Sequence, residues 1–187
     1  MNAVELHARA TPGFDDRVGA TLALLRNAAR VHDGRIVQAT SLGAEDMVLT
    51  DLIARHALPI TLATLDTGKL HGETLALIPR IEERYCLPVQ VFRPAQTAVV
   101  QFVAKNGERA MFDSIELRKA CCGIRKLEPL SHLLDGVGAW VTGLRREQSM
   151  QRADVPPYEV EATGRVKFNP LADWSWADVW HYIATHD

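Results

Sequence analysis

The stretch Arg35-Ile36-Val37-Gln38-Ala39-Thr40-Ser41-Leu42-Gly43-Ala44-Glu45-Asp46 joins a short apolar run to a polar loop that contains a glycine. The apolar part, residues 35–40, predicts a buried strand. A helix is expected to follow over 47–56, with Pro59 marking its end. A strand, a small-residue loop and a helix in this order are typical of a βα unit, the building block of α/β domains.

The same alternation continues along the chain. Further strands are predicted over 60–65, 88–92 and 139–142, and helices over 15–32, 72–85, 95–105 and 114–134. A hairpin is expected over 158–169 around Gly164, and a last helix over 176–185 with Ser175 as its cap. This order predicts an α/β fold, with a parallel, twisted sheet that helices cover on both faces. Residues 1–187 contain no internal repeat or linker, so we expect a single domain.

Composition argues against several classes of protein. A net charge of −2 and a pI near 6.4 give no sign of a nucleic-acid or membrane partner. No apolar run is long enough to span a membrane, and the N-terminus lacks the features of a signal peptide. Three cysteines without paired spacing disfavour a secreted disulfide scaffold. We therefore expect a protein of the reducing cytoplasm.

Cys121 and Cys122 are adjacent, within a basic string that runs from Arg118 to Lys126. Neighbouring thiols make poor disulfides, because the bridge strains the peptide between them. Nearby cations favour thiolates, so the pair indicates a soft metal, an iron–sulfur cluster or redox chemistry. The third cysteine, Cys86, is predicted to be a buried apolar thiol. Two cysteines are only half of a usual four-thiolate site, and Cys86 does not obviously complete it.

Three loops are predicted at the carboxyl ends of strands, where doubly wound sheets bind ligands. The 41–46 loop could cradle an anion with its backbone N–H groups, although an ordinary βα turn has the same composition. Asp66 could accept from a ribose hydroxyl or an adenine amine, or could simply favour a turn. Arg145, Arg146 and Arg152 follow another strand, and their guanidinium groups match phosphate or sulfate; a solvated charge run is the alternative.

Five segments, taken together and in this order, resemble the assimilatory adenylyl-sulfate and phosphoadenylyl-sulfate reductase family. They are Ser41–Asp46, Leu65–Gly68, Cys121–Lys126, Gly143–Ser149 and Asn169–Trp174. The resemblance covers residues 35–187 and implies an adenine-nucleotide α-hydrolase-like fold, related to the pyrophosphate-loop synthetases. It also implies reduction of adenylyl sulfate to sulfite and AMP, in sulfate assimilation toward cysteine. Thioredoxin or glutaredoxin would be the electron donor, and a homo-oligomer is a further expectation.

The resemblance assigns roles to individual residues. Cys121 and Cys122 would be two of the four ligands of a [4Fe–4S] cluster, which indicates the branch that reduces adenylyl sulfate. Lys126, with Arg125 beside it, would lie between the cluster and the phosphosulfate and support the reaction electrostatically. The nucleotide would be bound by Ser41, Gly43, Glu45, Asp46, Leu65, Asp66, Thr67, Gly68, Gly143, Arg145, Arg146 and Arg152.

Two family features are absent from residues 1–187: a later Cys-x-x-Cys and a Glu-Cys-Gly-x-His segment. In the family, the cysteine of that segment attacks the substrate sulfur, AMP leaves, and a dithiol then releases sulfite. We therefore expect a chain that is incomplete at its C-terminus and inactive by itself.

Three alternatives stay open. The chain could be a phosphoadenylyl-sulfate reductase, or a nucleotide-binding fragment without activity. It could also be a pyrophosphate-loop adenylyltransferase, although the 41–46 loop lacks the final serine of the Ser-Gly-Gly-x-Asp-Ser pattern.

Overall fold

The computed structural model of the protein describes residues 3–186, and its centre is a six-stranded sheet in the order β3-β2-β1-β4-β6-β5. The strands are β1 (Ile36–Thr40), β2 (Thr61–Leu65), β3 (Val89–Phe92), β4 (Ala139–Val141), β5 (Tyr158–Val160) and β6 (Val166–Phe168). All neighbouring strands run parallel except β5, which pairs antiparallel with β6 as the predicted hairpin. The predicted α/β fold is confirmed.

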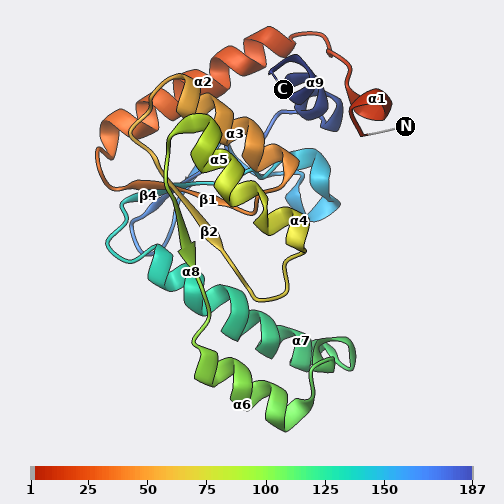
Figure 1. Ribbon diagram of the computed structural model, residues 1–187. Helices are drawn as coiled ribbons and strands as arrows, with labels where there is room; N and C mark the ends of the chain where they lie inside the picture. Colours follow the sequence, from red (N-terminus) through yellow and green to blue (C-terminus); the bar gives the residue numbers. More distant parts are fainter. Residues whose placement is uncertain (1–2, 187) are drawn as a thin grey trace.

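Helices cover both faces of the sheet (Figure 1). One face carries α2 (Phe14–Val31), α3 (Ala44–Arg55), α5 (Leu77–Tyr85) and α9 (Trp176–His186). Their larger core includes the fully buried side chains of Leu25, Leu49 and Trp174. On the other face lies α8 (Glu128–Leu133), where Leu133 packs with Val37 and Ala63. Strands enclosed on both sides are mainly apolar, and a polar residue buried among them, Gln38 of β1, donates from Nε2 to the Asp46 carbonyl at 2.8 Å.

Two helices, α6 (Gln96–Asn106) and α7 (Ile115–Cys122), project from the body as an arm (Figure 1). Between α7 and α8 the helix continues through a π-helical stretch, Gly123–Leu127, directly after the cysteine pair. Such wide turns are rare and often mark functional sites. The predicted helix over 114–134 is therefore continuous but not uniform. The remaining α-helices are α1 (Ala3–His7), which the sequence did not predict, and the short α4 (Gly72–Leu75), and short 3-10 helices span Ala110–Phe112, Arg146–Gln148 and Met150–Arg152.

Helix ends mostly agree with the sequence. The cap predicted for α9 is confirmed, because Ser175 Oγ accepts from the Asp178 N–H at 3.1 Å and donates to Asp178 Oδ2 at 2.8 Å. Helix α3 starts at Ala44, three residues earlier than expected, with Gly43 as its N-cap. The helix expected over 72–85 is split at Ala76. Within residues 3–186, no helix is both long and apolar enough to cross a membrane.

The prediction that Cys86 is a buried thiol is wrong, because the residue is exposed. It forms the C-cap of α5 with a left-handed backbone, φ 52°. This conformation turns the chain sharply from the helix toward β3 and leaves the thiol on the outside. Its position depends on how the helix ends, which the apolar character of neighbouring residues does not reveal.

Candidate functional site

A pocket of about 450 Å³ opens at the carboxyl ends of β1, β2 and β4. Strand order reverses at β1, since β2 and β4 lie on its two sides, and ligands of doubly wound sheets bind at such a switch point. We call this the strand-end pocket. Of the residues assigned to binding from the sequence, the pocket is lined by Ser41, Glu45, Asp46, Leu65, Thr67, Lys126, Gly143 and Arg152.

The loop between β1 and α3 is held by its own hydrogen bonds. Asp46 Oδ2 accepts from the backbone N–H of Ser41 at 2.7 Å and from its Oγ at 2.5 Å. Leu42 has a left-handed backbone, φ 62°, and its N–H donates to Thr40 Oγ1 at 3.0 Å. Gly43 gives α3 no side-chain cap, so the N–H groups of the first turn are available to an anion.

Asp46 joins this loop to the one after β4. Its side chain is buried, and burial raises the pKa of Asp46 above its usual value; hydrogen bonds from Ser41 oppose the rise and the charge of Glu45 adds to it. The backbone of Gly143 also donates to Asp46. A Cβ added to Gly143 would lie 2.5 Å from Asp46 Oδ1, so only glycine fits this close approach. Asp46 therefore fixes the relative position of two walls of the pocket.

Arg145 supports the pocket from behind. Its side chain is 4% exposed, and Nε and Nη2 donate to Glu45 Oε1 at 3.0 and 2.9 Å. Its Nη1 donates to Glu147 Oε2 and to the Trp174 carbonyl, both at 3.3 Å. The guanidinium that the sequence assigned to a substrate anion is thus engaged within the protein.

The other two arginines of this segment differ from each other. Arg146 donates from Nε to the Val155 carbonyl at 2.9 Å and pairs with Asp173, outside the pocket. Arg152 lines the pocket and donates to Gln148. Of the three, Arg152 is the one whose side chain reaches the pocket.

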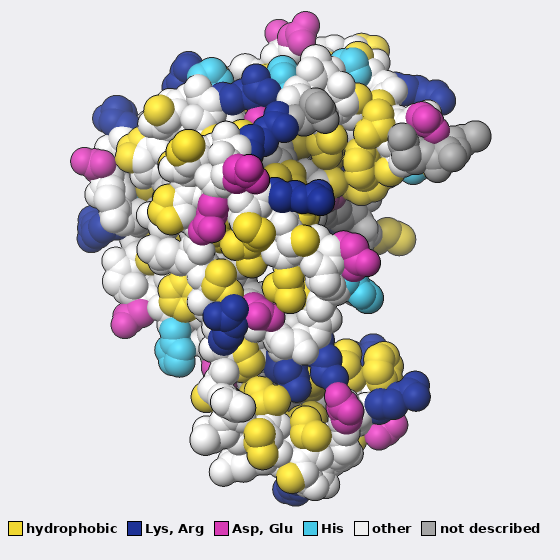
Figure 2. All heavy atoms as spheres, viewed as in Figure 1, with side chains coloured by type: hydrophobic (Ala, Val, Ile, Leu, Met, Phe, Trp, Pro, Cys, Tyr) yellow, Lys and Arg dark blue, Asp and Glu magenta, His cyan; other side chains and the backbone are white. Residues whose placement is uncertain are grey.

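In the loop after β2, some residues line the pocket and others do not. Leu65 and Thr67 line the pocket, whereas Asp66 accepts from the Gly68 N–H and from Arg93 Nε, both at 3.0 Å. Arg125 Nη1 donates to the Thr67 carbonyl at 2.7 Å. The next residue of the π-helical stretch, Lys126, lines the pocket. Figure 2 shows basic side chains gathered where the arm meets the body.

The cysteine pair lies one helical turn before these two basic residues. Cys121 is buried, Cys122 is half-buried, and both are free thiols. Among residues 3–186 there is no group of three or more His, Cys, Asp or Glu placed to hold a metal ion. Thiolates are the usual ligands of iron–sulfur clusters, which take four of them. The donors present fit half of such a site.

Ten of the eighteen residues that line the pocket were not assigned to it from the sequence, and two of these ten are Trp140 on β4 and Lys167 on β6. They are paired across the two strands, and Lys167 Nζ lies 5.6 Å from the centre of the Trp140 ring. Trp140 Nε1 is buried and has no hydrogen-bond partner in the described part of the chain. A buried donor without a partner fits a pocket that a polar ligand completes. No local signal identifies these residues, because only the pairing of β4 with β6 brings them to the pocket.

Comparisons with known proteins agree with this geometry. Residues 35–187 match the model of the phosphoadenosine phosphosulfate reductase domain. An adenosine 5'-phosphosulfate reductase of Burkholderia cepacia is 49% identical over 95% of this chain and 71% of its own length. The enzyme of the same name from Allochromatium vinosum is 48% identical, over 94% of this chain and 69% of its own.

Two solved structures are also similar. The phosphoadenylyl-sulfate reductase of Candida auris has a TM-score of 0.72 and 25% identity, over 95% of this chain and 87% of its own. An FMN adenylyltransferase of Candida glabrata has a TM-score of 0.60 at 15% identity, over 96% of this chain and 61% of its own. The second likeness is one of fold alone, and it agrees with the predicted relation to adenine-nucleotide α-hydrolase-like proteins.

Proposed function

Since the chain belongs to the phosphoadenosine phosphosulfate reductase family, we propose that its strand-end pocket binds adenylyl sulfate for reduction to sulfite and AMP. The observation that carries the proposal is the uncapped start of α3, which offers N–H donors between Ser41 and Asp46 at the switch point of the sheet. The names of the two similar reductases reported above support the 3'-hydroxyl nucleotide as the substrate.

The pocket residues suggest how the nucleotide would lie. Its phosphosulfate would meet the N-terminus of α3, with Lys126 and Arg152 as the cations that neutralise it. The adenosine would lie toward Leu65 and Thr67, and Trp140 Nε1 would donate to one of its polar atoms. Arg145 would act indirectly, by keeping Glu45 at the pocket wall.

In the proposed reaction a thiolate attacks the sulfur, the bond from sulfur to the phosphate oxygen breaks, and AMP leaves. A dithiol of the thioredoxin or glutaredoxin class would then supply two electrons and release sulfite. Among the described residues, no cysteine lines the strand-end pocket, so none of them is assigned as the attacking thiol. Lys126 would stabilise the negative charge that develops on the departing phosphate.

Cys121 and Cys122 would provide two of the four thiolates of a [4Fe–4S] cluster. When bound, such a cluster would supply electron-transfer and electrostatic chemistry beside the pocket. Within this chain, the π-helical stretch would place Lys126 between the cysteine pair and the nucleotide. We further propose that the protein works in the cytoplasm.

Calorimetric titration of the 187-residue chain with AMP and with adenosine 3',5'-bisphosphate tests substrate choice. We expect AMP to bind at least about tenfold more tightly, a difference of about 1.4 kcal/mol. Tighter binding of the bisphosphate would instead indicate phosphoadenylyl sulfate as the substrate. Binding of neither nucleotide would contradict the proposal.

The variant Lys126→Gln tests the role of the cation in the same assay, with adenylyl sulfate as the ligand. We expect about tenfold weaker binding, as for loss of one charge-assisted contact. Lys119→Gln is the matched control, since Lys119 is exposed on α7 and does not line the pocket. Equal affinities of the two variants would remove Lys126 from the proposed site.

A further inference from the structure

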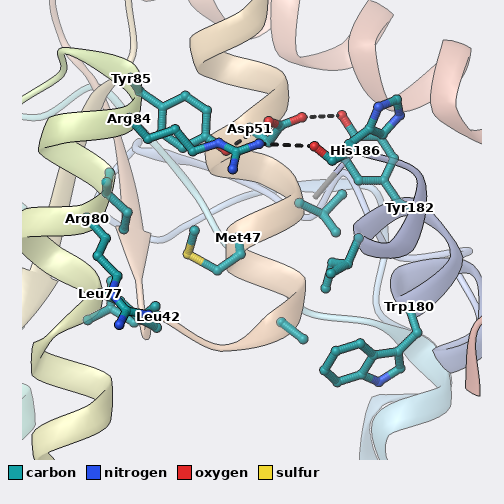
Figure 3. A pocket seen from close by; sticks show the side chains of 14 residues that line it. Leu42, Met47, Asp51, Leu77, Arg80, Arg84, Tyr85, Trp180, Tyr182 and His186 are labelled. Atoms are coloured by element: carbon teal, nitrogen blue, oxygen red, sulfur yellow. Dashed lines mark hydrogen bonds between the residues drawn. The ribbon is translucent and has the colours of Figure 1, made fainter. Parts of the chain in front are cut away.

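A second cavity, of about 520 Å³, lies between α3, α5 and α9 (Figure 3). We call it the rear cavity. Most of its lining is apolar, contributed by Leu42, Met47, Leu77, Ile81, Trp180 and Ile183. Its volume lies within the range of small-molecule sites, which are mainly apolar and carry a few placed polar groups.

Among residues 3–186, one carboxylate lines the rear cavity, and its hydrogen bonds are already made. Asp51 accepts from Tyr85 Oη and Tyr182 Oη at 2.8 Å each, and from Arg55 Nε at 2.7 Å. Arg55 also balances its charge at this short distance. Asp51 therefore adds no uncompensated negative charge to the cavity.

Two arginines of α5, Arg80 and Arg84, line the same cavity. Arg84 Nη2 donates to the carbonyl of His186 at 3.0 Å, as Figure 3 shows. Arg80 has no hydrogen-bond or ion-pair partner within residues 3–186. Figure 2 shows basic and acidic side chains beside hydrophobic ones on this part of the surface. Among the described lining residues, the cavity is thus apolar with two arginines and one aspartate that is already paired, which complements a ligand with an apolar body and an anionic group.

Leu42 connects the rear cavity to the strand-end pocket. Its side chain is 4% exposed and lines the rear cavity, whereas Ser41 before it and Glu45 after it line the strand-end pocket. A left-handed backbone is uncommon for leucine, so a shift of this residue would change the whole 41–46 loop. A ligand against Leu42 would therefore contact the wall that the two cavities share.

We propose that the rear cavity is a second ligand site, for a small molecule with an apolar body and one anionic group, and that its occupancy changes nucleotide affinity through Leu42. Ligand binding in the rear cavity is inferred from the cavity alone. The coupling part rests on the proposed nucleotide site, and the two parts are tested separately.

The binding test compares two fluorescent probes, 8-anilinonaphthalene-1-sulfonate and its uncharged counterpart N-phenyl-1-naphthylamine. We expect one sulfonate probe per chain. In Arg80→Gln its affinity should fall about tenfold, and in Arg80→Lys less than about threefold, while the uncharged probe changes little in either. Arg30→Gln, an exposed arginine of α2 away from the cavity, is the control for net charge.

Several outcomes would overturn the site. The first is a sulfonate affinity that Arg80→Gln and Arg30→Gln change equally. The second is binding of several probes per chain, which is typical of loose apolar surface. The third is probe binding only after a dimer dissociates in analytical ultracentrifugation, which would assign this face to contact between copies of the chain.

The coupling test titrates AMP with and without saturating sulfonate probe. We expect the AMP affinity to change at least about threefold, and AMP to change the probe affinity by the same factor, as linkage requires. In Arg80→Gln, at the same probe concentration, the change should be lost. An unchanged AMP affinity overturns the coupling and leaves the site. Failure of AMP to bind at all contradicts the proposed function, and with it the coupling, while the probe results stand.

Discussion

Helix α3 carries a buried aspartate on each of two sides, and the two carboxyl groups have different kinds of hydrogen-bond partner. Asp46, in the first turn, lies at the strand-end pocket and receives neutral donors from Ser41 and Gly143. Asp51, further along the helix, lies at the rear cavity and receives two tyrosine hydroxyls and the guanidinium of Arg55. Both side chains are nearly inaccessible to solvent.

Burial penalises the charge of both carboxylates, so their partners decide the outcome. At Asp51, burial raises the pKa, but hydrogen bonds from Arg55, Tyr182 and Tyr85 outweigh it and hold the pKa below 3.8. At Asp46 no cation compensates, and burial raises its pKa above 3.8. The nearby cation makes the difference: the Asp51 carboxylate stabilises the fold, whereas the charge of the Asp46 carboxylate costs stability. Asp46 lies where a ligand is expected, and carboxylates with a raised pKa are common at functional sites.

Replacement of Asp51 by asparagine should have the largest effect on stability. A hydrogen bond to a charged group contributes about 1.5–3 kcal/mol, and Asp51→Asn weakens or removes those from Tyr85, Tyr182 and the half-exposed Arg55, so we expect a loss of about 3 kcal/mol. Because the folded pKa of Asp51 is below its unfolded value of 3.8, its contribution is present above pH 3.8 and disappears as pH falls through the folded pKa. Burial and its bond to Asp51 raise the pKa of Tyr85 to about 12, so its hydroxyl keeps its proton throughout this range.

Urea unfolding at several pH values measures this effect. The difference between Asp51→Asn and wild type should be constant near neutral pH and shrink below pH 3.8. Asp135→Asn, at an exposed position, is the control. A deficit that does not change between neutral and acid pH would contradict the assigned role of the charge.

The next largest effect is expected from Gly143→Ala, which disturbs the Asp46 side alone. The new Cβ would lie 2.5 Å from Asp46 Oδ1 and 3.0 Å from Glu45 Cβ, so the two loops must separate. Such overpacking costs about 2 kcal/mol, and we expect AMP binding to weaken about thirtyfold. Calorimetry and thermal unfolding measure the two quantities. Gly19→Ala, where no atom lies within 4 Å of the new Cβ, should leave AMP binding unchanged.

The stability difference between Asp46→Asn and the wild type should change with pH in the opposite direction to that of Asp51→Asn. The folded pKa of Asp46 is above 3.8, so the wild-type protein loses stability as pH rises from 3.8 through the folded pKa, and the asparagine variant does not. The variant keeps one neutral acceptor oxygen in place of a carboxylate, which weakens the hydrogen bonds from Ser41 at a cost of about 1 kcal/mol. Its deficit should therefore shrink as pH rises, whereas that of Asp51→Asn grows. Parallel trends of the two variants in urea unfolding would show that the environments do not differ as described.

The fold was predictable because its signals are local. Each strand and most helices follow from a short apolar run and the loop after it, as in residues 35–46. The orientation of individual site residues was not predictable in the same way. Whether Arg145 faces a ligand or Glu45 depends on a contact across 100 positions of the chain. Trp140 and Lys167 reach the strand-end pocket only because β4 pairs with β6. Sequence patterns thus indicate which loops form the site, and long-range packing decides which side chains face it.

The smallest effect is expected at Arg125, which links the π-helical stretch after α7 to the wall of the strand-end pocket. Its Nη1 donates to the Thr67 carbonyl at 2.7 Å, and Gly68 lets the guanidinium approach so closely that an added Cβ would lie 3.2 Å away. Arg125→Gln removes this one bond from the side opposite Asp46. AMP affinity should fall about threefold, because the Thr67 loop is also held by β2 and by Asp66. Arg118→Gln, an exposed residue of α7, should have no effect in the same titration. If Arg125→Gln weakens AMP binding as much as Gly143→Ala does, the π-helical stretch after α7, and not the Asp46 contact, determines the shape of the pocket.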